Sequence, residues 1–280
     1  MVSNTIQGAG IGLRLPHAQQ VLAQSQLVAP WFELLVDNWL VEGGVNVYLL
    51  DAIAERYPLV LHGVGLSLGG AQPLDFDYLH RIKALKQRCG AVWYSEHACF
   101  CSDGHVQVPD LLPMPYTEEA VQYMAERISQ VQDFLGERLL LENVSTYLQY
   151  PSNEMSEGQF LSAVANEADC LLLLDINNAY VTSSNLEQSL AQFLAEIDHT
   201  KVKQIHLAGF EDKGDYLLDA HNHPVALPVW QAFSNYINQH GPVASMIEWD
   251  NDLPSLTQLL AERQQAETCL ERAAGLEVAS

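Results

Sequence analysis

Short apolar runs recur along the chain and alternate with longer amphipathic segments. Continuous apolar runs of this kind are typical of strands covered on both faces, as in a parallel sheet surrounded by helices. Eight runs alternating with helical patterns predict an α/β fold, a (β/α)8 TIM barrel, and 280 residues is an ordinary length for it. The expected strands are Ala9–Leu13, Trp31–Leu35, Leu59–Leu61, Val92–Ser95, Leu139–Glu142, Leu171–Asp175, Val202–His206 and Ala244–Glu248.

The alternation continues without a Gly, Pro or Ser-rich linker, which predicts one domain over residues 1–280 with a frayed tail at about 275–280. Between the expected strands, Leu74–Arg88 and Thr117–Leu135 have helical spacing. The segment Asp252-Leu-Pro-Ser predicts the start of the last helix, with Pro254 in its first turn. The connection Ala98–Tyr116 is unusually long and is expected to form a lid or a substrate wall; its Cys99 and Cys101 are interpreted as ordinary loop cysteines.

Composition excludes several classes of function. The formal net charge is −22, with only 13 lysine and arginine residues, so nucleic acid and anionic membrane surfaces are not expected partners. Five cysteines do not indicate a disulfide framework. The N-terminal residues resemble no signal peptide, and no apolar run reaches the length of a membrane span, so we expect a cytoplasmic protein.

Acid or imidazole side chains stand where six of the apolar runs end, at intervals of 31 to 45 residues. In a parallel barrel the C-terminal ends of all strands meet at one rim, so these side chains should converge there. Buried carboxylates are unfavourable unless they are paired or bind a metal, and imidazole with carboxylate is a common ligand set for transition metals. The sequence therefore predicts a metal site built from His62, His97, Glu142, Asp175, His206 and Glu248.

A second set of polar residues is expected on the same rim. Asp219 and His221 are two residues apart, and Asn178 follows Asp175 by three. Together Asn178, Asp219 and His221 are candidate ligands of a third ion. The alternative is that Asp219 and His221 form an ordinary loop hydrogen bond.

The order of these residues resembles that of the xylose-isomerase-like superfamily of barrels. The resemblance implies that Glu142 bridges two ions, with Asp175, His206 and Glu248 completing one site and His62 and His97 the other. Zinc-dependent abasic-site endonucleases share this plan, with an Asp-x-His pair at a third metal. A zinc or manganese hydrolase or isomerase of this superfamily is therefore the alternative interpretation, although the acidic charge disfavours a DNA substrate.

Eight longer segments resemble one family more specifically, the multinuclear non-haem iron-dependent oxidative enzymes (MNIO). The resemblance implies two or three iron ions that activate O2 to modify cysteine residues of a ribosomally synthesised precursor peptide, with Glu142 and Asp175 as catalytic residues. It also implies a small partner protein that binds the leader segment of the peptide. The segments are Gly10–His17, Glu33–Trp39, His62–Gly69, Ser95–His97, Glu142–Tyr147, Leu174–Asn178, Gln204–Phe210 and Ile247–Asp252.

Metal identity does not follow from the ligand types, since the same set also accepts zinc or manganese.

Glu33, Asp37, Asn38 and Trp39 lie near the end of the second expected strand. These four residues are candidates for contact with the metal-binding residues or with substrate, and we expect Asp37 and Asn38 to contact substrate; packing and helix capping are the alternatives.

Overall fold

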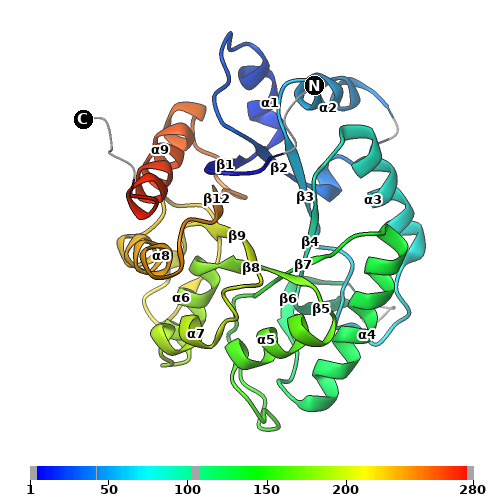
Figure 1. Cartoon of the computed structure of the whole chain (residues 1–280), viewed down its shortest axis with the longest axis vertical. Helices are drawn as coiled ribbons and strands as arrows, with labels where there is room; N and C mark the ends of the chain where they lie inside the picture. Colours follow the sequence, from blue (N-terminus) through cyan, green and yellow to red (C-terminus); the bar gives the residue numbers. More distant parts are fainter. Residues whose placement is uncertain (1–4, 42, 103–106, 276–280) are drawn as a thin grey trace.

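Eight parallel strands form a closed barrel in the computed structural model, which describes residues 5–41, 43–102 and 107–275. The strands follow one another around the barrel in the order β1-β12-β9-β8-β7-β4-β3-β2, and helices surround them (Figure 1). The predicted (β/α)8 barrel is confirmed. Its strands are β1 (Ala9–Gly12), β2 (Phe32–Leu35), β3 (Leu59–His62), β4 (Tyr94–His97), β7 (Leu140–Glu142), β8 (Leu171–Asp175), β9 (Val202–Leu207) and β12 (Ala244–Ile247).

Most of the helices begin at a residue whose side chain caps the first turn. Asp75, Thr117, Ser156, Ser189 and Ser255 each accept a hydrogen bond from a backbone N–H of the first turn that follows. The helices are α1 (Leu15–Leu22), α2 (Val45–Ala54), α3 (Phe76–Cys89), α4 (Glu118–Leu135), α5 (Glu157–Glu167), α6 (Ile176–Asn185), α7 (Leu190–Glu196), α8 (Leu227–His240) and α9 (Leu256–Ala273), and Val36–Asn38 forms a 3-10 turn, η1.

The predicted start of the last helix is wrong. Helix α9 begins after Ser255, so Pro254 lies outside its first turn. The Pro254 carbonyl oxygen instead lies 2.9 Å from Nε2 of the buried His17 and accepts a hydrogen bond from it. This contact fixes the chain ahead of the helix, and the side chain of Ser255 provides the cap.

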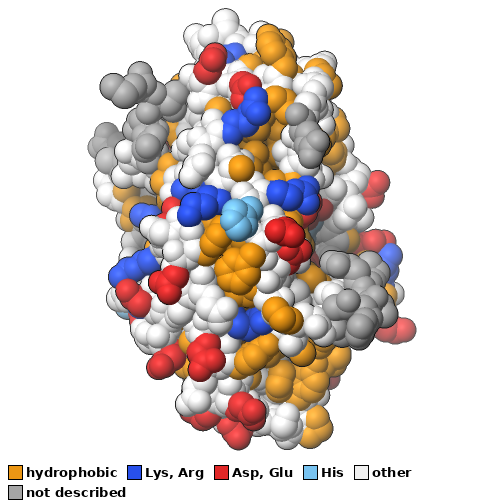
Figure 2. Space-filling view, turned by 90° about the vertical axis from the view of Figure 1, so that its right-hand side faces the viewer, with side chains coloured by type: hydrophobic (Ala, Val, Ile, Leu, Met, Phe, Trp, Pro, Cys, Tyr) orange, Lys and Arg blue, Asp and Glu red, His pale blue; other side chains and the backbone are white. Residues whose placement is uncertain are grey.

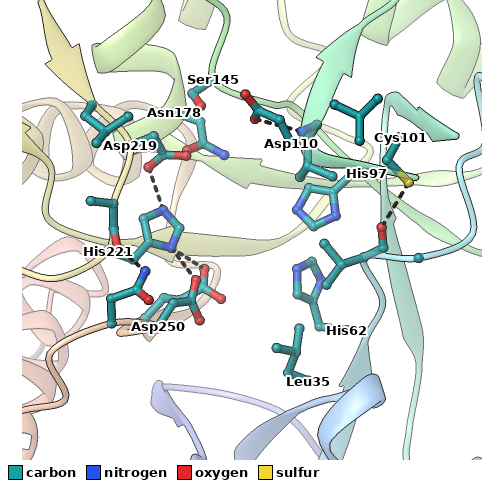
Figure 3. A pocket seen from close by; sticks show the side chains of 18 of the residues that line it. Leu35, His62, His97, Cys101, Asp110, Ser145, Asn178, Asp219, His221 and Asp250 are labelled. Carbon is teal, nitrogen blue, oxygen red and sulfur yellow. Dashed lines mark hydrogen bonds and ion pairs between the residues drawn. The ribbon is translucent and has the colours of Figure 1, made fainter. Parts of the chain in front are cut away.

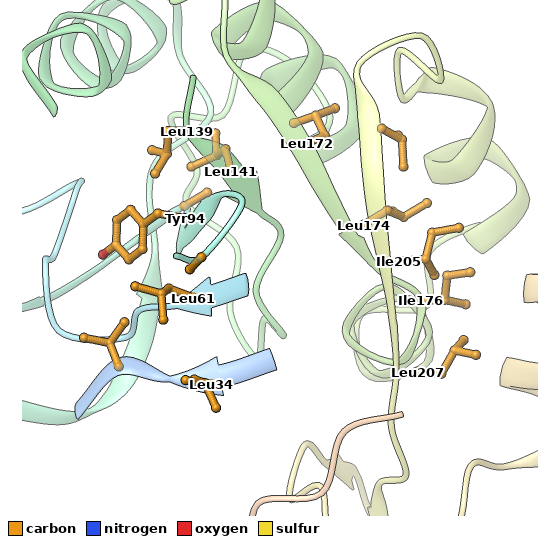
Figure 4. Close-up of a cluster of buried hydrophobic side chains, with 14 of the residues drawn as sticks. Leu34, Leu61, Tyr94, Leu139, Leu141, Leu172, Leu174, Ile176, Ile205 and Leu207 are labelled. Atoms are coloured by element: carbon orange, nitrogen blue, oxygen red, sulfur yellow. The ribbon is translucent and has the colours of Figure 1, made fainter. Parts of the chain in front are cut away.

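Successive side chains along each strand point to opposite sides of the barrel wall, and this divides the core into two clusters. Leu34, Leu61, Leu141, Leu174 and Ile205 point outward and pack beneath the helices (Figure 4). The residues between them point inward, since successive strand side chains face opposite sides. The inner cluster closes the barrel below the rim and contains Ile6, Trp31, Val60, Trp93, Leu140, Leu173 and Met246.

The inner cluster explains why ligand-type residues follow the apolar runs. His62, Glu142, Asp175 and Glu248 each stand two positions after an inner apolar residue and therefore share its face. Strands β3 and β4 extend beyond their expected ends, and β4 ends at His97 instead of Ser95. Ser95, Glu96 and His97 are buried although they are polar, so hydrophobicity ends before the strand does.

The long connection after β4 forms an antiparallel hairpin of β5 (Cys99–Ser102) and β6 (Gln107–Pro113). A second small hairpin pairs β10 (Glu211–Asp212) with β11 (Leu217–Leu218) after β9.

The five cysteines are free thiols. Within the described residues, every helix is too short or too polar to cross a membrane. Of the expected frayed tail, about 275–280, residues 276–280 lie outside the described part of the chain.

Candidate metal centre

A pocket of about 530 Å³ opens at the C-terminal rim of the barrel. Its walls come from the strand ends and from β6, β11 and the loops that precede α8 and α9 (Figure 3). Glu142, Asp175 and His206 lie beneath this lining and are at most 1% exposed. The predicted residues that line the pocket directly are Asp37, His62, His97, Asn178, Asp219, His221 and Glu248.

Glu142 faces three histidines with its two carboxylate oxygens. Oε2 lies 3.3 Å from Nε2 of His62 and 3.2 Å from Nε2 of His97. Oε1 lies 3.3 Å from Nδ1 of His206. One carboxylate therefore joins two groups of donor atoms within 4.8 Å of one another, His62–His97–Glu142 and Glu142–Asp175–His206–Glu248.

Hydrogen bonds on the far side of each ring select the nitrogen that faces the site. Nδ1 of His62 lies 2.8 Å from Ser95 Oγ, and Nδ1 of His97 lies 3.0 Å from the Gly63 carbonyl oxygen. Nε2 of both rings is thus left for a ligand. His206 is reversed: its Nε2 lies 3.0 Å from Glu33 Oε2, and its Nδ1 faces the site. Carboxylates and carbonyls placed behind histidine ligands in this way orient metal-binding rings in general.

Buried atoms without hydrogen-bond partners test whether these residues fit a metal. Asp175 uses Oδ1 to cap α6, where it accepts a hydrogen bond from Asn178 N, and its Oδ2 has no such partner. Buried donor and acceptor atoms usually have partners, and a cation satisfies several of them at once. The residues fit a cationic group, because the buried atoms without a hydrogen bond include Glu142 Oε2, Asp175 Oδ2, Asn178 Oδ1, His206 Nδ1 and His221 Nε2.

His221 gathers a third group of ligand atoms. Its Nε2 lies 2.7 Å from Asp219 Oδ1, and its Nδ1 lies 2.9 Å from Asp250 Oδ2. Glu248 Oε2 lies 3.5 Å from the same Nδ1, and His221, Glu248 and Asp250 have ligand atoms within 4.8 Å of one another. Asn178 and Asp219 line the same pocket, but neither belongs to this group of ligand atoms.

Sequence reasoning missed two charged residues that contact the ligand candidates, Asp250 and Arg14. Glu33 was a candidate for contact with substrate or with the metal-binding residues, and it lies behind His206. Asp250 follows Glu248 by two residues and contacts His221. Arg14, buried after β1, donates to Glu248 Oε1 at 3.2 Å and also to Asp250. The spacing of Asp250 from Glu248 was the available signal, whereas the contacts of Arg14 and Glu33 are recognisable only once the barrel closes and β1 lies between β12 and β2.

The charges in the cluster are strongly coupled. Burial raises the pKa of Asp175 well above its usual range. Burial opposes ionisation of Glu248 as well, but His206 and His221 lower its pKa well below the usual range. For His97, burial opposes the charge, yet Glu142 and Glu96 raise the pKa of the ring to about 9. These side chains compete for the same protons, which a bound cation would displace.

The predicted substrate contacts are placed differently. Asp37 lines the pocket and accepts a hydrogen bond from Tyr78 Oη, 3.1 Å away. Asn38 is on the same turn, but it is not among the described residues that line the pocket. Cys101, interpreted from sequence as an ordinary loop residue, does line it, and a hydrogen bond from Cys99 lowers the pKa of the Cys101 thiol to about 7.

The fold and the site define a class of protein, the (β/α)8 barrels that carry buried histidine and carboxylate clusters at the rim. Over residues 8–271 the chain matches the model of the RiPP precursor modification enzymes MbnB/TglH/ChrH, and it belongs to this enzyme family. RiPPs are ribosomally synthesised and post-translationally modified peptides, so the family implies a peptide substrate.

Relatives of similar length support this assignment. A UPF0276 protein of Acaryochloris marina is 47% identical over 271 residues, covering 96% of this chain and 98% of the relative. A UPF0276 protein of Caulobacter vibrioides is 41% identical over 262 residues, covering 94% of each chain.

Solved structures share the fold at low sequence identity. A D-allulose 3-epimerase from Methylomonas sp. superposes with a TM-score of 0.59 at 14% identity, covering 98% of each chain. Endonuclease IV from Thermus thermophilus gives a TM-score of 0.60 at 14% identity, covering 95% of this chain and 99% of that one.

Proposed function

We propose that this protein is a multinuclear iron-dependent oxidase that uses O2 to modify cysteine residues of a ribosomally synthesised precursor peptide. The observation that supports it most is the position of Glu142, whose two oxygens face His62 and His97 on one side and His206 on the other. A carboxylate between histidine groups is suited to bridge two ions. The family to which the chain belongs supports the peptide substrate.

Each ligand group has a defined task in this proposal. His62, His97 and Glu142 hold one ion, and Glu142, Asp175, His206 and Glu248 hold the second. Asn178, Asp219 and His221 are the proposed ligands of a third. Iron held by imidazole and carboxylate would supply one-electron chemistry toward O2 and an open position for a substrate thiolate.

The remaining residues keep the ligands charged and oriented. Ser95, the Gly63 carbonyl and Glu33 accept the ring protons of the three histidines, so that the other nitrogens face the site, where a bound cation would displace any proton. Arg14 offsets part of the carboxylate charge at Glu248. Glu142 and Asp175 are the proposed catalytic residues, because both are buried next to the reacting centre.

The substrate enters through the open side of the pocket. Leu35, Val64 and Leu111 provide apolar walls there, and Asp37 provides a polar contact. Asn38 remains a proposed substrate contact on the same turn. A small protein that binds the leader segment of the peptide is the proposed partner.

Metal analysis tests the proposal directly. Protein purified without chelator from iron-supplemented cells should contain two to three irons per chain. The variant Glu142→Gln should hold less than one, because it loses the bridging charge, while the exposed control Glu119→Gln should match the parent protein. The iron-loaded protein should consume O2 with a cysteine-containing precursor peptide encoded beside its gene.

Zinc or manganese alone, retained after anaerobic reconstitution with iron, would favour the hydrolase or isomerase alternative. Iron loading without O2 consumption on any neighbouring cysteine-containing peptide would contradict the oxidase.

A further inference from the structure

A second cavity, of about 450 Å³, lies between α5, α6 and α7, outside the metal pocket. Its volume is within the range of small-ligand sites, roughly 300–1,000 Å³. Glu157, Glu187 and Glu196 line it, and no lysine or arginine is among the described residues that do so. The cavity is therefore acidic.

Glu157 is a buried carboxyl group without a partner. It is 7% exposed and makes neither a hydrogen bond nor an ion pair with another described residue. Glu196, across the cavity, accepts hydrogen bonds from Ser156 Oγ and from Gln192 Nε2, the latter at 2.9 Å. A buried carboxyl group left without a partner destabilises the fold unless a ligand satisfies it.

Helix capping does not account for Glu157. The first turn of α5 already has a complete capping box, in which Ser156 and Gln159 satisfy each other's backbone N–H groups. Glu157 stands at the first position of the helix and lines the cavity. Its burial is thus left to be explained by what enters the cavity.

The segment that follows β7 lines the metal pocket, a neighbouring groove and the acidic cavity in turn. Ser145 and Tyr147 line both the metal pocket and a neighbouring apolar groove of about 520 Å³. Leu148 lines both that groove and the acidic cavity. An extended chain whose reacting residue lies in the metal pocket would therefore pass along the groove toward Glu157.

We propose that the acidic cavity binds the side-chain cation of a lysine or arginine residue of the peptide substrate, away from the residue that reacts. The inference rests on the proposed function, which has a peptide as substrate. It adds a second contact by which the protein would recognise that peptide. An ammonium or guanidinium group would pair with Glu157, and the rings of Tyr116 and Tyr150 line the same cavity as contacts for a cation.

Binding should also release a proton. Burial raises the pKa of Glu157 to about 8, so this carboxyl group is largely protonated at neutral pH when the cavity is empty. A cation favours the ionised form, and the proton leaves to buffer. The other titratable groups facing the cavity are Tyr116, Tyr150, Glu187 and Glu196.

Isothermal titration with Nα-acetyl-lysinamide tests the proposal, with the neutral, nearly isosteric Nα-acetyl-norleucinamide as control ligand. The lysine probe should bind at least tenfold more tightly at pH 7, and its binding enthalpy should depend on the ionisation enthalpy of the buffer. Glu157→Gln should weaken binding tenfold or more and abolish the buffer dependence. Glu167→Gln, which removes the same charge from the exposed end of α5, should bind like the parent protein.

Equal binding of the two probes, or no binding of either at millimolar concentration, would overturn the proposal without reference to any variant. Unchanged binding by Glu157→Gln would overturn it as well. The titration needs neither iron nor O2. A protein that binds the lysine probe but holds no iron would therefore contradict only the oxidase proposal.

Discussion

At the scale of single residues, the orientation of His206 distinguishes it from the other two histidines around Glu142. It faces the site with Nδ1, and Glu33 lies behind its Nε2. Gln204 donates to Glu33 and is itself held by Trp93, whose Nε1 lies 2.7 Å from Gln204 Oε1. A chain of buried hydrogen bonds thus sets which nitrogen of His206 can bind a metal.

Glu33→Gln should weaken metal binding although Glu33 is not a proposed ligand. The glutamine amide can donate to Nε2 and thereby move the ring proton to Nδ1, the nitrogen that faces the site. Loss of such a supporting group typically costs about 10- to 100-fold in metal affinity. Competition with a chelator measures the affinity, and Glu55→Gln, an exposed change of the same charge, is the control. Equal affinities for Glu33→Gln and the parent protein would contradict this role.

At the scale of elements, glycine residues allow close approach where the site is built. A Cβ at Gly10 would lie 2.5 Å from the ring of Trp31, which fills the barrel below the rim. A Cβ at Gly209, shortly after β9, would lie 2.0 Å from the carbonyl oxygen of His223. Backbone cannot move aside as a flexible side chain can, so Gly209 fixes how near the His221 loop comes to β9.

Gly209→Ala should therefore destabilise the protein and disturb the third ligand group. We expect a loss of about 1–3 kcal/mol in the free energy of unfolding, measured by urea denaturation. Metal analysis should show a lower content, with the loss confined to the ion at His221. Gly43→Ala is the control, because a Cβ there meets no atom within 4 Å. A variant as stable as the control would contradict the steric argument.

The start of α5 should give the stability a pH dependence. Burial raises the pKa of Glu157 from 4.5 to about 8 in the folded protein. Between these values the folded state holds a proton that the unfolded state has released. The free energy of unfolding therefore falls as the pH rises, by about 1 kcal/mol per pH unit and a few kcal/mol in all.

Glu157→Gln should remove this fall, so the variant should be more stable than the parent at pH 8 and similar to it near pH 4.5. Urea denaturation across this pH range, with Glu167→Gln as the control, measures the difference. A parallel pH dependence in parent and Glu157→Gln would show that Glu157 does not titrate abnormally.

At the scale of the whole molecule, charge is distributed unevenly. Figure 2 shows lysine and arginine side chains gathered on the face that carries α3 and α4. Helix α3 alone contains Arg81, Lys83, Lys86 and Arg88, of 13 basic residues in the chain. Several of them are already paired, Arg88 with Asp51 and Lys86 with Glu137. Arg14 is the basic residue that lies against the proposed ligands. Histidines and bound metal must therefore neutralise most of the negative charge of the rim carboxylates.

Metal loading should consequently raise the thermal stability. A ligand that binds only the folded protein adds about 2.7 kcal/mol at a hundredfold excess over its Kd. Calorimetry under anaerobic conditions should show a Tm several degrees higher with iron than without it. The Tm should rise with iron concentration and return to the value of the metal-free protein after chelation. Glu142→Gln should show a much smaller shift. Identical Tm values with and without iron would contradict a metal site in the barrel.

The sequence by itself determined the barrel fold and the position of the candidate site at the C-terminal rim of the barrel. Apolar runs at regular intervals define the strands, and alternation puts a residue two places beyond an inner apolar side chain on the same inner face. His62, Glu142, Asp175 and Glu248 follow that rule, so local pattern was enough to predict their convergence. The position of these residues at the rim was thus predictable from the pattern alone.

Only the tertiary structure decided which groups support these residues. Glu33 lies 173 positions before His206 in the chain, and Arg14 lies 234 before Glu248. Barrel closure brings β1 beside β12, and no periodicity in the sequence encodes contacts across the barrel. The cavity at Glu157 depends in the same way on how three helices pack. Side-chain direction along one strand is a local property, whereas partners, cavities and ring tautomers are fixed only when distant elements meet.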